Sequence, residues 1–298
     1  MERQSIRIER TNDGYEKQYI DILRTIKYYG FHQENTEDGT DIICIPHAVI
    51  SVNLEDEFPI LKCREVNWKR ILEDILWIMQ LQSNNTADLS NDLWRLAANE
   101  DGTVGKSLGY QVGKEVYMDN IRYDSQVHYV LNRLSADPFD RSATITLWDV
   151  DDLNDMKIFP DCVMSSWNIV NGQLNCMIIQ KDSSFNAVPE VTTQYAMLLT
   201  LFARHIGVDP GRLTHVMSDV YINDTDEADR MIENHNRWYD GALLSNSFVA
   251  ELSKSSEVFR RAIEVDESVP VFVVNSDETD FFAIELKDCS VDDYKYMD

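Results

Sequence analysis

Apolar side chains recur at three- and four-residue intervals in two long segments, residues 15–29 and 67–82. This spacing places them along one face of a helix, so both segments are predicted to be amphipathic helices. A third and longer apolar segment opens at Pro189 and ends at about His205, before Gly207. Proline suits the first turn of a helix and glycine suits its end, so a buried helix is expected there.

Segments rich in β-branched residues predict the strands of a sheet. Residues 42–54 form one such segment, although Pro46 within it indicates a sheet edge or a bulge. Asn171-Gly172, a dipeptide typical of hairpin turns, joins two more. The remaining elements are expected as helices at 91–98, 124–134 and within 225–265, and as strands at 143–147, 162–170, 173–180, 213–222, 271–274 and 281–286. This mixture predicts an α+β fold with helices packed on a sheet.

The composition favours one large core. The chain has 298 residues, of which 44% are hydrophobic, and its 11 glycines and 7 prolines mark no linker. A single domain over residues 1–298 is therefore expected, with residues 1–14 as a polar lead. The 52 acidic and 27 basic residues give a formal net charge of −25. Such a charge repels phosphate backbones and anionic membranes, which argues against nucleic-acid and membrane binding and would suit a basic protein partner.

The cysteines indicate neither a metal site nor a disulfide framework. There are 5 of them, an odd number, and their spacing matches no zinc-binding pattern. The N-terminal residues do not resemble a signal peptide, and no apolar run is long enough to span a bilayer. A protein of the reducing cytoplasm without a bound metal is therefore expected.

Several segments resemble, in the same order, sequences of the thymidylate synthase and pyrimidine hydroxymethylase family. EFPILKCREVNWKRILEDILW at residues 57–77 is similar to the family segment that ends in its E-L-L-W motif. NRLSADPFDRSATITLWDV at 132–150, FPDCVMSSWNIVNGQLNCMIIQK at 159–181 and GRLTHVMSD at 211–219 resemble later family segments. The likeness covers about residues 15–294. It implies a mixed β-sheet covered by helices, with a sheet face forming a homodimer interface.

The resemblance also implies a reaction at C5 of a pyrimidine ring. In the family a cysteine thiolate adds to C6, and C5 then attacks a one-carbon unit carried by methylene tetrahydrofolate. This chemistry requires a thiol of lowered pKa and a carboxylate that relays protons. Arginines hold the nucleotide phosphate, and two of them come from the partner subunit, so the resemblance implies an obligate homodimer.

The position of the nucleophile is ambiguous in this chain. Counted back from the Asn171-Gly172 turn, Asp161 occupies the family's nucleophile position and Cys162 follows it. Cys162 would face the site only if its strand carries a bulge, because a shift of one residue turns a side chain to the other face. Otherwise it is a small buried hydrophobic residue. Asp74 matches the relay glutamate with one methylene fewer, and it could instead be a solvated helix residue.

The residues that match the family's phosphate and base contacts are largely changed. The positions of the arginines are taken by Glu37, Arg141, Ser142 and Lys181. Since a hydrogen bond to a charged group contributes about 1.5–3 kcal/mol, an ordinary nucleoside monophosphate is expected to bind poorly. Val191 stands where the family reads the base with asparagine or aspartate, and its side chain cannot form those hydrogen bonds.

Other matched positions are kept only in part. Gln180 keeps its place in a nucleotide-binding segment, and Asp219 matches an aspartate of a later strand. Tyr221 and Asn223 stand where the family has a histidine and a tyrosine that contact ribose and phosphate, whereas a shift of two residues would align Asp219 with that histidine and Tyr221 with that tyrosine. Trp94 matches a tryptophan that orients the folate, and it would serve equally well in the core.

Two functional hypotheses follow from this pattern. The first is a catalytically inactive homologue that needs no cofactor and acts as a structural, regulatory or interaction protein. Residues 287–298, an acidic tail that lacks the family's folate-closing segment, agree with it. The alternative is a folate-dependent C5 methyl- or hydroxymethyltransferase acting on an unusual pyrimidine nucleotide or nucleoside. It would use Cys162 as nucleophile and Asp74 as relay, with Arg141 and Lys181 near an anionic group.

Overall fold

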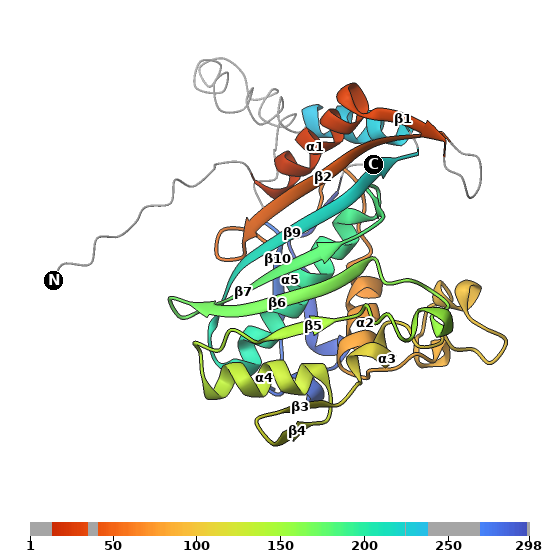
Figure 1. The fold of residues 1–298 in the computed structure, drawn as a ribbon. Helices are drawn as coiled ribbons and strands as arrows, with labels where there is room; N and C mark the ends of the chain where they lie inside the picture. Colours follow the sequence, from red (N-terminus) through yellow and green to blue (C-terminus); the bar gives the residue numbers. More distant parts are fainter. Residues whose placement is uncertain (1–13, 35–40, 224, 238–268, 297–298) are drawn as a thin grey trace, which may run out of the picture.

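A mixed seven-stranded sheet crosses the structure, with helix α5 behind its central strands (Figure 1). The computed structural model describes residues 14–34, 41–223, 225–237 and 269–296. The strand order is β1-β2-β9-β7-β6-β5, and β8 pairs with β9. The strands are β1 (Phe31–Glu34), β2 (Asp41–Asn53), β5 (Thr144–Thr146), β6 (Cys162–Val170), β7 (Gln173–Gln180), β8 (Ser183–Ser184) and β9 (Asp209–Ile222). Because β7 and β8 run parallel to β9 while the other pairs are antiparallel, the predicted mixed α+β fold is confirmed.

Four of the helices in the described part of the chain cover the sheet and one another. α5 (Val188–Ile206) is buried along most of its length between the sheet and α2 (Trp68–Met79). α1 (Tyr15–Tyr29) packs on β2, and α4 (Gln126–Ala136) packs on β5. The apolar spacing predicted all four helices to within a few residues. No helix in the described part of the chain is long and apolar enough to cross a membrane.

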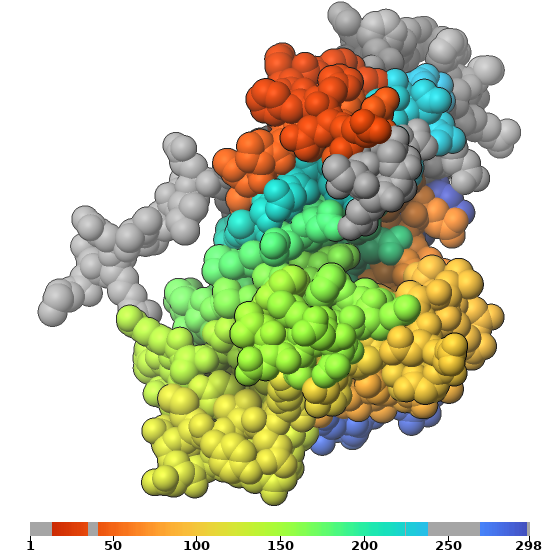
Figure 2. Space-filling model, turned by 45° about the vertical axis from the view of Figure 1, so that its right-hand side comes forward, coloured from red at the N-terminus to blue at the C-terminus, as the bar shows by residue number. Residues whose placement is uncertain are grey.

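The helix at residues 225–237 packs against α1, and Figure 2 shows these residues in cyan beside the red N-terminal helix. Glu16 links them, because its carboxylate lies 3.0 Å from His235 Nδ1 and accepts a hydrogen bond from Cys63 N at 3.2 Å. This helix confirms the beginning of the helical segment predicted at 225–265. The rest of that segment lies outside the described residues, as do residues 1–13 of the polar lead and Glu37.

Local backbone geometry confirms the predicted turns. Asn171 and Gly172 have φ angles of 56° and 78°, the left-handed pair that a two-residue hairpin needs between β6 and β7. Gly207 ends α5 with a φ angle of 83°. Pro46 lies within β2, beyond the residues that pair with β1, so the residues that flank it, Ile45 and His47, pair with β9 alone. The prediction of a sheet edge at Pro46 is therefore confirmed.

The predicted strand at residues 281–286 is wrong. β10 (Val271–Val274) pairs instead with β11 (Cys289–Asp292), whereas residues Phe281–Ala283 form a short 3-10 turn. The Phe281 ring is buried 4.9 Å from the ring of Phe202 on α5. Gln80 Nε2 donates hydrogen bonds to the carbonyl oxygens of Phe281 and Ile284, at 2.5 and 2.9 Å. The apolar run is thus buried through aromatic packing and side-chain hydrogen bonds, without a strand partner.

Burial alternates along β9 and distinguishes the two faces of the sheet. Leu213 and Met217 are buried against the helices, whereas Thr214 and Val216 between them are partly exposed on the opposite face. The resemblance assigns a sheet face to the homodimer interface, and that assignment stays a prediction. The C-terminal segment packs elsewhere, where Tyr294 Oη accepts a hydrogen bond from Val66 N at 2.7 Å.

Figure 2 shows the blue C-terminal residues against the orange residues that include α2. Replacing Gln80 with alanine should lower the free energy of unfolding by about 1–3 kcal/mol, because two partly buried carbonyl groups lose their donor. Urea unfolding measures the change. Lys287→Ala alters an exposed side chain of the same segment and should shift stability by less than about 0.5 kcal/mol. Equal stability of Gln80→Ala and the parent protein would contradict this role of Gln80.

Candidate active site

Helix α2 places a basic and an acidic side chain one turn apart on the same face. Arg70 Nη1 lies 3.1 Å from Asp74 Oδ2, and Trp94 Nε1 donates a hydrogen bond to Asp74 Oδ1 at 3.0 Å. The Asp74 side chain is only 4% exposed, so it is buried and not a solvated helix residue. Burial raises the pKa of this carboxyl, and the hydrogen bond from Trp94 and the charge of Arg70 oppose the rise.

Arg70 also pairs with Glu190 in the first turn of α5, through Nη2 and Oε2. One guanidinium is therefore shared by two carboxylates that lie on different helices. Sequence reasoning missed both Arg70 and Glu190, because only the apolar positions of α2 and α5 were used to predict these helices. The four-residue spacing of Arg70 and Asp74 is the signal that could have identified the first pair.

These side chains line a pocket of about 240 Å³ between α2, α5 and the start of β6. Ile75, Met79 and Leu147 are among the apolar residues of its wall. The pocket also contains several predicted site residues, namely Asp74, Trp94, Asp161, Cys162 and Val191. The structure thus brings together both candidate nucleophile positions, the relay carboxylate, the base-reading position and the folate position.

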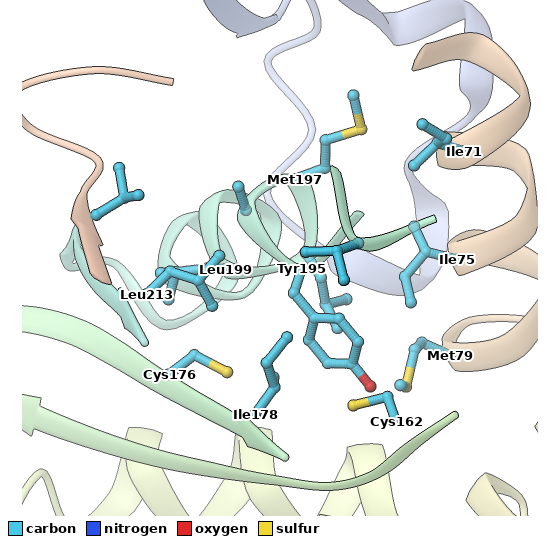
Figure 3. Packing of buried hydrophobic residues seen from close by; sticks show 14 of the residues in the cluster. Ile71, Ile75, Met79, Cys162, Cys176, Ile178, Tyr195, Met197, Leu199 and Leu213 are labelled. Atoms are coloured by element: carbon cyan, nitrogen blue, oxygen red, sulfur yellow. The ribbon is translucent and has the colours of Figure 1, made fainter. Parts of the chain in front are cut away.

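Cys162 faces the helix side of the sheet, and β6 is irregular directly after it. The pairing of β6 with β7 shifts register between Cys162 and Met164, which is the bulge that this orientation requires. The residue is 7% exposed, and Figure 3 shows its sulfur pointing toward the hydroxyl of Tyr195. Burial raises the pKa of the thiol to about 12, although the hydrogen bond from Tyr195 lowers it. The neighbouring Asp161 raises it further, so the thiol is protonated at neutral pH.

Asp161 lines the same pocket. None of the residues that the structure describes donates a hydrogen bond to its carboxylate, whereas its main-chain oxygen accepts one from Lys181 N at 2.8 Å. The residue is exposed. Desolvation, followed by the charge of Asp182, raises the pKa of this carboxyl to about 6. At neutral pH it therefore places a negative charge at the pocket wall.

The arrangement of sheet and helices matches a known family. A family model for thymidylate synthase matches residues 17–298. The chain belongs to the thymidylate synthase family. It is 29% identical over 286 residues to thymidylate synthase of Clostridium beijerinckii, with 95% of each chain covered.

A second relative and a solved structure agree. The chain is 30% identical over 223 residues to thymidylate synthase of Bacillus licheniformis, with 70% of this chain and 79% of that one covered. The structure of thermostable thymidylate synthase A from Bacillus subtilis is similar with a TM-score of 0.79 at 23% identity. It covers 95% of this chain and 96% of that one, which shows a shared fold.

Two residues that the thymidylate synthase resemblance assigns to nucleotide binding are held by other contacts. Gln180 is buried on β7, where its Oε1 lies 2.8 Å from His215 Nε2, and His215 Nδ1 lies 3.0 Å from Thr192 Oγ1. Burial lowers the pKa of His215 to about 3, so this network is neutral. The Lys181 ammonium lies 5.5 Å from the centre of the Trp148 ring. Neither Gln180 nor Lys181 lines the pocket.

The other predicted nucleotide-binding residues are also separated from it. Asp219 and Tyr221 line a second depression of about 290 Å³, together with Asp182 and residues of β1 and β2. Asn223 is exposed after the end of β9, and Arg141 is exposed on the loop before β5. Within the described ranges, no three histidine, cysteine or acidic side chains gather closely enough to hold a metal ion.

Replacing Arg70 with alanine should lower the free energy of unfolding by about 3 kcal/mol at neutral pH, because the buried Asp74 carboxylate loses its counter-ion. The loss should shrink as the pH falls. An acid whose pKa is raised in the folded state is disfavoured only while it is ionised, and protonation removes the unpaired charge. Urea unfolding over a range of pH measures both effects.

Two further variants control this experiment. Asp74→Asn in the Arg70→Ala background should recover part of the lost stability, since it removes the unpaired charge. Arg95→Ala deletes an arginine that is 51% exposed and should change stability by less than about 0.5 kcal/mol. A loss in Arg70→Ala that is the same at every pH would show that packing, and not charge, causes it.

Proposed function

We propose that this member of the thymidylate synthase family does not form thymidylate and acts instead as a structural, regulatory or interaction protein. The observation that carries the proposal is the state of charge in the pocket. Its thiol is buried beside an acidic residue, and the Arg70 guanidinium is already shared by Asp74 and Glu190. The family's reaction needs the opposite, an ionised thiol and cations that remain available to hold a phosphate.

The thiol is poorly suited to nucleophilic attack. Burial raises the pKa of the Cys162 thiol to about 12, so the thiol is protonated at pH 7. Reactive thiols lie near arginine, lysine or protonated histidine, or at a helix N-terminus, where the thiolate is stabilised. The charged neighbour here is Asp161, which acts in the other direction. The first step of the family's reaction is therefore disfavoured.

A nucleotide phosphate would meet carboxylates in this protein. Asp161 lines the pocket itself. Asp182 directly follows Lys181, whose ammonium lies over the Trp148 ring. Like charges repel strongly where water is partly excluded. Within the described part of one protomer, the guanidinium that lines the pocket is the one paired to Asp74 and Glu190. These contacts support weak binding of nucleoside monophosphates.

We also propose that the chain forms a homodimer through the uncovered face of its sheet. The partly exposed side chains that alternate along β9, such as Thr214 and Val216, support this interface. A formal net charge of −25 suits a basic protein partner on the remaining surface.

Calorimetry with dUMP, with and without methylene tetrahydrofolate, should show no binding tighter than about 1 mM. In parallel, no tritium should be released from dUMP labelled at C5, because the addition to C6 does not take place. An active thymidylate synthase assayed in the same buffers provides the positive control. Micromolar binding together with tritium release would overturn the proposal.

The bulge after Cys162 favours a second candidate function. Because the bulge keeps the thiol at the pocket wall, this chain could be a folate-dependent C5 methyl- or hydroxymethyltransferase that acts on an unusual pyrimidine. The partly exposed apolar side chains of Leu93 and Phe159, together with Trp94, fit the flat ring of a reduced folate. That cofactor would supply the one-carbon unit. Asp74 would hold the proton that the relay requires.

Alkylation by iodoacetamide separates the two candidates. At pH 7 the buried, protonated Cys162 should react far more slowly than the partly exposed Cys44, as measured by peptide mass spectrometry. Cys162→Ala should lower the free energy of unfolding by about 1 kcal/mol, the cost of a lost buried side chain. Rapid labelling of Cys162, blocked by a pyrimidine ligand, would favour the enzymatic candidate.

A further inference from the structure

We propose that the mouth of the pocket is a docking surface for a basic segment of another protein, which inserts one apolar side chain into the pocket. The docking surface is made of apolar side chains from two segments of the chain, namely Leu93, Trp94 and Leu96 from one and Trp148 and Phe159 from the other. This inference rests on the proposed function, since an interaction protein needs such a surface, and it adds the chemistry of the partner.

Large apolar side chains of this surface are exposed beside a buried core. Leu93 and Phe159 line the pocket and are 53% and 56% exposed, and Leu96 is 91% exposed. Leu93 and Leu96 are three residues apart at the 3-10 helix η2 (Trp94–Ala97), a spacing that places both side chains on one side of such a helix. Figure 2 shows the two segments beside each other, with residues near 100 in golden yellow and residues near 150 in lime green. Single exposed apolar residues are ordinary, whereas a group from two distant segments around one pocket is typical of an interaction site.

Helix α2 fixes the turn that carries the two leucines. Trp94 Nε1 donates a hydrogen bond to the buried Asp74 at 3.0 Å, and the Trp94 ring lies 5.8 Å from that of Trp77. Two hydrogen bonds to the Glu73 carboxylate, at 2.6 and 3.0 Å, hold the residues just before this turn. Because the backbone is held in this way, the leucines stay exposed instead of turning into the core. A partner therefore binds an ordered surface, which lowers the entropy lost on binding.

The inside of the pocket suits an apolar side chain. The buried polar groups that line it already have partners, because Asp74 accepts hydrogen bonds from Arg70 and Trp94, and the Cys162 thiol is hydrogen-bonded to Tyr195. The rest of the buried wall is apolar, with Ile75, Met79 and Leu147 among its residues. The volume of about 240 Å³ lies below the roughly 300–1,000 Å³ of pockets that hold drug-sized ligands. A pocket of this size fits one aromatic or branched side chain that anchors a larger partner.

The two segments that carry the docking surface are acidic. Residues 88–101 include four acidic side chains and one arginine, and residues 149–161 include five acidic side chains and one lysine. Lys106 and Lys114 form ion pairs with three of the latter acids, so an excess of carboxylates remains. This charge attracts a basic partner. A second copy of this chain would bring the same acidic segments and would be repelled.

Three synthetic peptides with blocked ends test the two requirements. Calorimetry should show that the peptide KKFKK binds at least about tenfold more tightly than KKAKK, because its phenylalanine ring leaves water when it enters the pocket. The peptide EEFEE should bind more weakly than either, since its carboxylates meet like charges. Equal affinities of KKFKK and KKAKK, or of KKFKK and EEFEE, would overturn the inference.

Three variants locate the binding site. Leu93→Ser and Phe159→Ser should each remove most of the preference for KKFKK over KKAKK, while thermal unfolding shows that both variants are folded. Tyr117→Ser is the matched control, because it removes an aromatic side chain that is 70% exposed on β3 (Val116–Met118) and does not line the pocket. It should leave the preference intact. An unchanged preference in both pocket variants, or an equal loss in Tyr117→Ser, would overturn the inference.

Ionic strength gives an independent readout. Added salt should weaken the binding of both basic peptides, because it screens their attraction to the carboxylates. The ratio of the two affinities should stay nearly constant, since the burial of an apolar ring is not screened. A ratio that disappears with added salt would overturn the insertion of the side chain.

The remaining outcomes separate this inference from the proposed function. A dimer that Phe159→Ser dissociates in sedimentation would assign the surface to a second copy and overturn the inference. Failure of KKFKK to bind, without tritium release from dUMP, would overturn this inference alone. Tritium release from dUMP would overturn the proposed function on which the inference rests.

Discussion

The structure depends on the burial of α5 between the sheet and the other helices. Phe202 near its C-terminal end lies with its ring 4.8 Å from that of Trp167 on β6 and 4.9 Å from that of Phe281. At the other end, Thr193 donates a hydrogen bond to the carbonyl oxygen of Pro59 at 2.7 Å. Because α5 is held at both ends, its first turn can present Glu190 and Val191 to the pocket in fixed positions.

Arg70 makes the pocket part of the same packing. Its contacts with Asp74 and Glu190 connect α2 to α5, and they allow a carboxylate to be buried in an otherwise apolar wall. Both terminal nitrogens of the Arg70 guanidinium are engaged in these two ion pairs. A cation that neutralises two internal acids stabilises the fold and is unavailable to an anionic ligand, so structural and ligand-binding uses of Arg70 exclude each other.

Local sequence signals predicted the elements whose pattern is complete within a short segment of the chain. The periodic apolar residues of α2 and α5 and the Asn171-Gly172 turn required no knowledge of distant contacts. The run at 281–286 was misassigned because its burial comes from Phe202 and Gln80, which lie far away in the sequence. Asp74 and Cys162, which the resemblance offered as candidate site residues, both line the pocket. The bridge to Glu190 depends on tertiary packing and could not be read from the spacing.

The pocket could change its charges because the residues that hold the fold are separate from it. Trp77 and Trp167 are fully buried, and neither lines the pocket. An acidic side chain in a pocket is tolerated when it has a counter-ion, as Asp74 does, or when it remains hydrated and can take up a proton. Asp161, which is exposed and has a pKa of about 6, follows the second route. Conservation of this fold therefore places little constraint on the ligand that the pocket accepts, and the charges that line it are the better guide to function.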